Sequence, residues 1–156
     1  MPNFRLFLQC ELTNIISVAP KPNRSWGMKI ECSKCHEKGD NFIYVDENET
    51  EETTGGGSAN HVSGCKFCKN QVTINVVPKS VGAYTGGAPA GIITFDFRGA
   101  EPYQLELDDD WVAIAAESEA TFEDGVDLSQ DWCDYDEKGS QEVMITNPSV
   151  TFERVK

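Results

Sequence analysis

The sequence predicts a mainly β protein, built from antiparallel sandwich-like or barrel-like sheets with little helix. Apolar and polar side chains alternate with a period of two in several short stretches, which is the pattern of half-buried strands. Segments rich in Pro, Gly or Asn separate these stretches, as they do in antiparallel all-β folds. A length of 156 residues is enough for one domain with a substantial core.

Five stretches show the alternation. In the first of them Phe4, Leu6 and Leu8 share one face. Arg5 lies on the opposite face, where Phe7 is the one apolar exception. The predicted strands cover residues 4–12, 26–32, 71–77, 93–98 and 150–153. Polar or glycine-rich segments are expected to connect the elements at residues 20–25, 46–58 and 78–91.

Residues 108–120 fit two kinds of element. The three aspartates at 108–110 could cap a helix, because acids are favourable near a helix N-terminus. Val112, Ile114 and Ala116 also alternate as the inward side chains of a strand would. We expect strand or extended structure here.

The formal net charge of −13 is concentrated in the second part of the chain. Residues 1–100 hold ten acids and ten bases, whereas residues 101–156 hold sixteen acids and three bases. Clustered carboxylates repel phosphate groups, which disfavours nucleic acid and anionic membranes as partners. We expect a single compact domain over 1–156, with at most a weak division into 1–90 and an acidic β part at 91–156.

The chain shows no membrane or secretion signal. No apolar run approaches the roughly 20 residues needed to cross a bilayer. The N-terminal stretch is interrupted by Arg5, Gln9 and Glu11, which does not fit a signal peptide. We therefore expect a cytoplasmic protein with access to the nucleus, whose six cysteines are thiols or metal ligands rather than disulfides.

Four cysteines form two matched pairs, Cys32 with Cys35 and Cys65 with Cys68, in the pattern C-x2-C-x29-C-x2-C. A two-residue spacer lets both thiolates of a pair reach one ion at about 2.3 Å. Each pair adjoins a predicted strand, which is the arrangement of a two-knuckle zinc ribbon. We expect these four residues to bind one structural Zn²⁺ within the 1–90 part.

Other roles for these residues remain open. The two pairs could be redox dithiols, although no helix visibly follows either of them. They could also be small buried apolar residues. His36 or His61 could replace a cysteine as a ligand, because both lie near the pairs in sequence. Cys10 shares the apolar face of the first strand and is expected to be a buried thiol.

Four sequence blocks resemble the eukaryotic family of CXXC-motif-containing zinc-binding proteins, long catalogued as an uncharacterised family. They cover residues 24–35, 57–68, 95–102 and 131–138. The blocks RGAEP and DWCDYDEK make the resemblance more specific than the cysteine pairs alone. The resemblance implies a small β-rich zinc-binding protein without established catalysis, and its zinc ligands map to Cys32, Cys35, Cys65 and Cys68.

The function we expect is therefore that of a non-enzymatic zinc-binding protein, monomeric and acting on a protein partner or in metal homeostasis. One alternative is a thiol enzyme similar to methionine sulfoxide reductases, with Cys133 as nucleophile. Surrounding carboxylates would raise the pKa of such a thiol and weaken it. A second alternative is a zinc ribbon that binds single-stranded nucleic acid through Lys66, Phe67 and Lys69.

Overall fold

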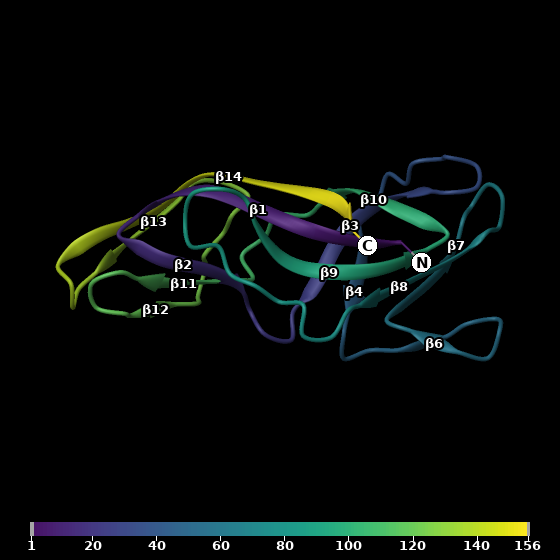
Figure 1. The fold of residues 1–156 in the computed structure, drawn as a ribbon, viewed down its shortest axis with the longest axis horizontal. Helices are drawn as coiled ribbons and strands as arrows, with labels where there is room; N and C mark the ends of the chain where they lie inside the picture. The colour runs from purple at the N-terminus through teal and green to yellow at the C-terminus, as the bar shows by residue number, and fades with distance from the viewer. Residues whose placement is uncertain (1, 156) are drawn as a thin grey trace.

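The computed structural model describes residues 2–155, and over that range it contains fourteen β-strands and no helix (Figure 1). The largest sheet has six antiparallel strands. Their order is β13 (Trp132–Asp136), β14 (Gln141–Val155), β1 (Asn3–Thr13), β9 (Ala90–Arg98), β8 (Gln71–Val76) and β7 (His61–Gly64). The long strands β1, β9 and β14 run along an elongated molecule and connect its two ends.

Three smaller sheets complete the fold. One has the order β10 (Ala100–Leu105), β3 (Ser25–Cys32) and β4 (Ile43–Asp46). Another has the order β12 (Thr121–Phe122), β11 (Trp111–Ala115) and β2 (Ile15–Pro20), and a short ribbon pairs β5 (Glu51–Glu52) with β6 (Ser58–Ala59). Figure 1 places β10, β3 and β4 towards one end of the molecule, and β2, β11, β12 and β13 towards the other.

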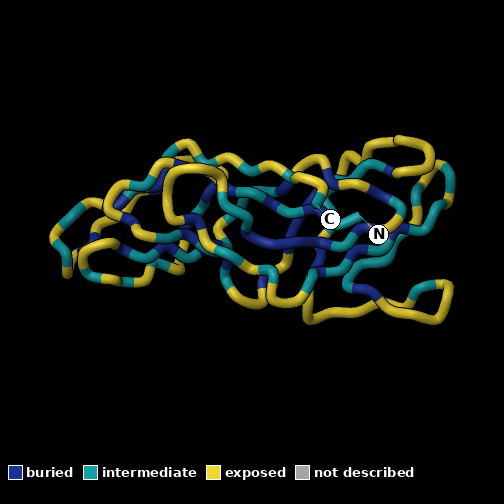
Figure 2. The backbone as a smooth tube through the Cα atoms, in the orientation of Figure 1, coloured by how far each residue is buried: buried dark blue, intermediate teal, exposed yellow. Residues whose placement is uncertain are grey.

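Alternating side chains build the core as the sequence predicts. Phe4, Leu6 and Leu8 of β1 are buried, and Phe4 packs edge-on against Phe97 of β9 with 5.5 Å between ring centroids. The strands expected at 4–12, 26–32, 71–77 and 93–98 are confirmed as β1, β3, β8 and β9, and 150–153 lies within the longer β14. In Figure 2 the buried residues follow the middle of the molecule and the exposed ones gather in the loops.

The segment 108–120 contains the strand β11 (Trp111–Ala115), as expected, but the predicted inward face is wrong. Trp111, Ala113 and Ala115 of β11 are fully buried, whereas Val112 and Ile114 are only partly buried. Trp111 packs edge-on against the indole of Trp26 at 6.0 Å, which turns the odd-numbered face inward. An indole excludes far more water than a valine side chain, so the large ring decides which face is buried.

Two of the predicted connections contain more structure than expected. The segment 46–58 is exposed at most positions but includes β5 and the first residue of β6. The segment 78–91 holds Tyr84, which is buried and pairs its backbone with Val18. The Tyr84 hydroxyl also donates to the carbonyl oxygen of Cys10 at 2.7 Å, so this tyrosine helps to anchor the long connection to the core.

Arg24 is a buried cation between two sheets. It lies in the turn between β2 and β3, with 6% of its surface exposed. Its guanidinium lies 4.0 Å over the Trp26 ring and donates to the Asp108 carboxylate at 2.6 Å. Burial lowers the pKa of Arg24, and burial also raises the pKa of Asp108 although the guanidinium opposes that shift. The aspartate that could have capped a helix therefore neutralises a buried arginine.

Candidate metal centre

The first cysteine pair lies in a tight turn at the end of β3. The Cys32 N–H donates to the Glu37 carbonyl at 3.0 Å, and the His36 N–H donates back to the Cys32 carbonyl at 2.9 Å. The returning chain then pairs at Lys38 with Glu31. His36 has a φ of 64°, the left-handed conformation that reverses the chain within a few residues.

The second cysteine pair repeats this geometry in the turn between β7 and β8. The Cys65 N–H donates to the Asn70 carbonyl at 2.9 Å, and the Lys69 N–H donates to the Cys65 carbonyl at 3.0 Å. Lys69 again has a φ of 64°. The two turns are thus equivalent knuckles, each presenting two thiols on the same side of a hairpin.

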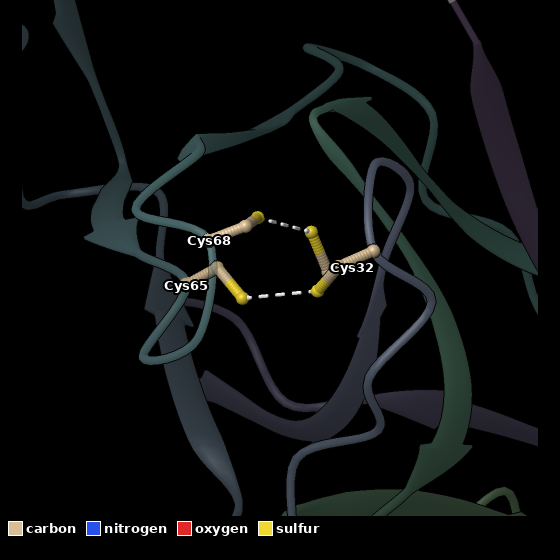
Figure 3. A group of neighbouring side chains, drawn as sticks. Cys32, Cys65 and Cys68 are labelled. Atoms are coloured by element: carbon tan, nitrogen blue, oxygen red, sulfur yellow. Dashed lines mark hydrogen bonds between the residues drawn. The ribbon is translucent and has the colours of Figure 1, made fainter.

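The fold brings the four sulfur atoms together. The Sγ atoms of Cys32 and Cys68 are 3.6 Å apart (Figure 3), and those of Cys35 and Cys65 are 3.5 Å apart. All four Sγ atoms lie within 4.8 Å of one another. Four sulfurs at about 2.3 Å around one tetrahedral zinc would be about 3.8 Å apart, which is close to the 3.6 and 3.5 Å of these two pairs. The four cysteines are therefore positioned to bind one metal ion.

Backbone amides make the knuckles favourable for thiolates. Hydrogen bonds from the backbone N–H groups of Cys35 and Lys34 lower the pKa of Cys32 to about 6, against the opposing effect of burial. The N–H groups of Cys68 and Phe67 likewise lower the pKa of Cys65. Such donors stabilise sulfur charge before a cation arrives.

Crowding has the opposite effect on Cys35. The Glu37 N–H lowers the pKa of its thiol, but loss of water and hydrogen bonds with the three neighbouring thiols together raise it to about 12. Four adjacent sulfurs cannot all be ionised when no cation balances them. A divalent cation would remove this repulsion, so the chemistry of the donor set also fits a metal.

The turn between β9 and β10 closes one side of the site. The Gly99 carbonyl accepts the Ser33 N–H of the first knuckle at 3.0 Å and the side-chain Nδ2 of Asn70, next to the second knuckle, at 3.2 Å. Ala100, which follows, pairs with Cys32 across the β10–β3 ladder. Cys32 is buried in this setting, whereas Cys35 is exposed.

A cleft of about 500 Å³ adjoins the other side of the cluster. Cys32 and Cys65 form part of its wall, and Ile30, Ile43 and Val72 give it apolar lining. Phe67, between the two cysteines of the second knuckle, also lines the cleft and has 70% of its surface exposed.

The remaining candidate residues lie outside the sulfur cluster, as far as the described residues show. His36 is near Glu31, with 3.7 Å between Nδ1 and the carboxylate, and His61 lies partly buried in β7. Cys10 is buried, as expected, and burial raises the pKa of its thiol to about 11. Cys133 is exposed on β13, which Figure 1 shows at the end of the molecule opposite β7.

Two residues of the site were not singled out by the sequence. Asn70 and Gly99 meet at 3.2 Å although 29 positions separate them. The only local signals are an asparagine shortly after Cys68 and a glycine directly after a predicted strand. Neither signal identifies the residue that would be its contact partner.

The chain matches the family model described as "CXXC motif containing zinc binding protein, eukaryotic" over residues 5–153. It is 34% identical to the UPF0587 protein F46B6.12 of Caenorhabditis elegans, covering 100% of this chain and 97% of that protein. It is 30% identical to the human protein named CXXC motif containing zinc binding protein, covering 100% and 99% of the two chains.

Solved structures share the architecture. The crystal structure of C1orf123 superposes with a TM-score of 0.90 at 28% identity and covers 98% of this chain and 99% of that one. A hypothetical protein from Plasmodium falciparum superposes with a TM-score of 0.86 at 21% identity, covering 98% and 100% of the two chains. The second likeness concerns the fold alone.

The described residues include no helix long and apolar enough to cross a membrane.

Proposed function

Because the chain belongs to the eukaryotic family of CXXC motif containing zinc binding proteins, we propose that its four clustered cysteines hold one structural Zn²⁺. The ligands would be Cys32, Cys35, Cys65 and Cys68. The convergence of four sulfur atoms within 4.8 Å from two equivalent knuckles is the observation that supports this assignment.

We further propose that the protein acts by binding rather than by catalysis. Four thiolates complete the tetrahedral shell of a zinc ion and leave no position for a water or substrate. Zinc bound in this way supplies structural cross-linking and no activated nucleophile. Cys133, the nucleophile of the enzymatic alternative, lies on the strand at the far end of the molecule.

The knuckles would then join two sheets through the metal. Cys32 ends β3 of the three-stranded sheet, whereas Cys65 and Cys68 lie between β7 and β8 of the six-stranded sheet. Structural zinc binding is worth about 10–16 kcal/mol at neutral pH, which is comparable to the stability of a whole domain. Metal binding would fix the cleft beside the cluster and the exposed ring of Phe67.

A protein partner in the cytoplasm remains our proposal for the target. The exposed Phe67 beside the apolar lining of the adjacent cleft supports it, because protein interfaces are enriched in aromatic side chains. A role in metal homeostasis would use the same site with exchangeable zinc. We expect the protein to be a monomer.

Metal quantitation on the purified protein tests the zinc site. We expect one zinc per chain in the wild type, loss of zinc in Cys65→Ser, and retention in Cys133→Ser, which removes an exposed thiol outside the cluster. A wild type without zinc, or full retention by Cys65→Ser, would overturn the assignment.

A further inference from the structure

One carbonyl oxygen joins the two knuckles. The Gly99 oxygen accepts the Ser33 N–H at 3.0 Å and the Asn70 Nδ2 at 3.2 Å. Ser33 belongs to the first knuckle, and Asn70 directly follows the second one in sequence. The β9–β10 turn therefore sets the spacing of two hairpins that come from different sheets.

Asn70 also contacts both knuckles itself. Its backbone carbonyl accepts the Cys65 N–H at 2.9 Å, which closes the second knuckle. Its Nδ2 lies 4.0 Å from the Sγ of Cys32, within the hydrogen-bonding reach of sulfur. One side-chain amide thus faces a carbonyl of the turn and the buried sulfur of the opposite knuckle.

The close approach of the turn depends on a glycine. Gly99 has a φ of 85°, in the left-handed region, and a Cβ there would lie 2.3 Å from the Gln71 carbonyl oxygen. The same Cβ would be 3.1 Å from the Asn70 Nδ2. The backbone of the turn is therefore pressed against the second hairpin at the point where Asn70 bonds to it.

We propose that Asn70 is a positioning residue of the metal site, whose side-chain amide holds the two knuckles at the separation that four metal-bound sulfurs require. This inference rests on the proposed zinc site. Residues that orient ligands in this way commonly change metal affinity about 10- to 100-fold when they are replaced. Preorganisation acts by removing the cost of ordering the ligands when the metal binds.

Zinc dissociation from the full chain tests the proposal. Purified zinc-loaded protein is mixed with excess chelator, and release is followed with a zinc-sensitive dye. We expect Asn70→Ala to release zinc about 10-fold or more faster than the wild type. Asn48→Ala is the matched control, because it also removes a side-chain amide that donates to another residue, Asn23, at 3.1 Å. It should release zinc at the wild-type rate.

Asn70→Asp separates hydrogen bonding from packing. Aspartate keeps the shape of asparagine but presents an oxygen where Nδ2 faced the Gly99 carbonyl and the Cys32 sulfur. A donor role predicts that Asn70→Asp releases zinc at least as fast as Asn70→Ala. A packing role alone predicts that Asn70→Asp behaves as the wild type does, and that result would overturn the proposal.

The cobalt-substituted proteins provide a second readout. We expect both Asn70 variants to keep the thiolate-to-cobalt absorption of a four-sulfur site, because the ligands themselves are unchanged. Wild-type release rates in both variants, or loss of a sulfur ligand in their spectra, would contradict a positioning role. A wild type that binds no zinc would instead refute the proposed function, so the two failures are distinguishable.

Discussion

At the scale of single residues, the structure depends on polar groups that are buried with their partners. Arg24 packs over the rings of both Trp26 and Trp111, with guanidinium-to-centroid distances of 4.0 and 5.2 Å. Its charge is balanced by Asp108 at 2.6 Å, and it also donates to the Asp110 carbonyl at 2.9 Å. These contacts connect the turn before β3 to the loop before β11.

Removing the anion should leave a buried cation without its partner. We expect Asp108→Ala to lower the free energy of unfolding by about 3 kcal/mol, the lower part of the range for broken buried pairs, because Asp108 is itself partly exposed. Asp109→Ala removes an exposed carboxylate next to it and should change stability by less than about 0.5 kcal/mol. Denaturant titration of both variants measures the difference, and equal midpoints would contradict this role for the ion pair.

At the scale of elements, a turn determines how the metal site is assembled. The β9–β10 turn places Gly99 against the second hairpin and Ala100 against Cys32. The ladder between β10 and β3 then continues away from the site. The block RGAEP, part of the family resemblance, therefore includes the turn that touches both knuckles.

Gly99→Ala should destabilise the protein through a clash as well as backbone strain. A left-handed φ costs a residue with a Cβ about 1–2 kcal/mol, and the contact with the Gln71 carbonyl should add about 1–3 kcal/mol. Gly125→Ala is the matched control, because its φ is 73° and nothing lies within 4 Å of the added Cβ. Thermal unfolding of zinc-loaded protein should show the larger loss for Gly99→Ala. Similar losses in the two variants would contradict the close approach.

Alternation within a strand could be recognised from the sequence, whereas pairing between strands could not. Strands β1, β3, β8 and β9 follow their own apolar pattern. By contrast, β13 exposes Cys133, Asp134 and Tyr135 in succession, so buried and exposed side chains do not alternate along it. It is a strand because it pairs with β14 at the edge of the large sheet.

The metal site shows the same distinction. Each C-x-x-C pair is a local pattern, and the presence of two matched pairs was sufficient to predict that the four cysteines cluster. The contact between Asn70 and Gly99 depends on how two hairpins and a turn meet in space. The inward face of β11 likewise depends on the packing of Trp111 against Trp26, which the alternation of Val112 and Ile114 does not reveal.

At the scale of the whole molecule, the two parts of the chain share one sheet. Strand β1 pairs with β14 on one side and with β9 on the other, so strands from the two parts of the chain are interleaved in this sheet. We propose that the chain unfolds as a single domain for this reason. The simplest role for the excess carboxylates in the second part of the chain is to keep the protein soluble.

Zinc removal should loosen one end of the molecule before the rest. The knuckles are held by few backbone bonds apart from the metal, whereas β1, β9 and β14 form long ladders. After treatment with chelator, we expect amide hydrogen exchange to accelerate at residues 32–39 and 64–71 and to change little in β1. Uniform acceleration along the chain, or none at all, would show that the metal does not stabilise this end selectively.

X-ray absorption at the zinc edge tests the central claim most directly, because it reports the atoms bound to the metal in the intact protein. A structural site formed by Cys32, Cys35, Cys65 and Cys68 predicts four sulfur neighbours at about 2.3 Å and no shorter shell of nitrogen or oxygen. A shell containing nitrogen or oxygen near 2.0–2.1 Å would mean that a histidine, carboxylate or water completes the site, and it would contradict the account.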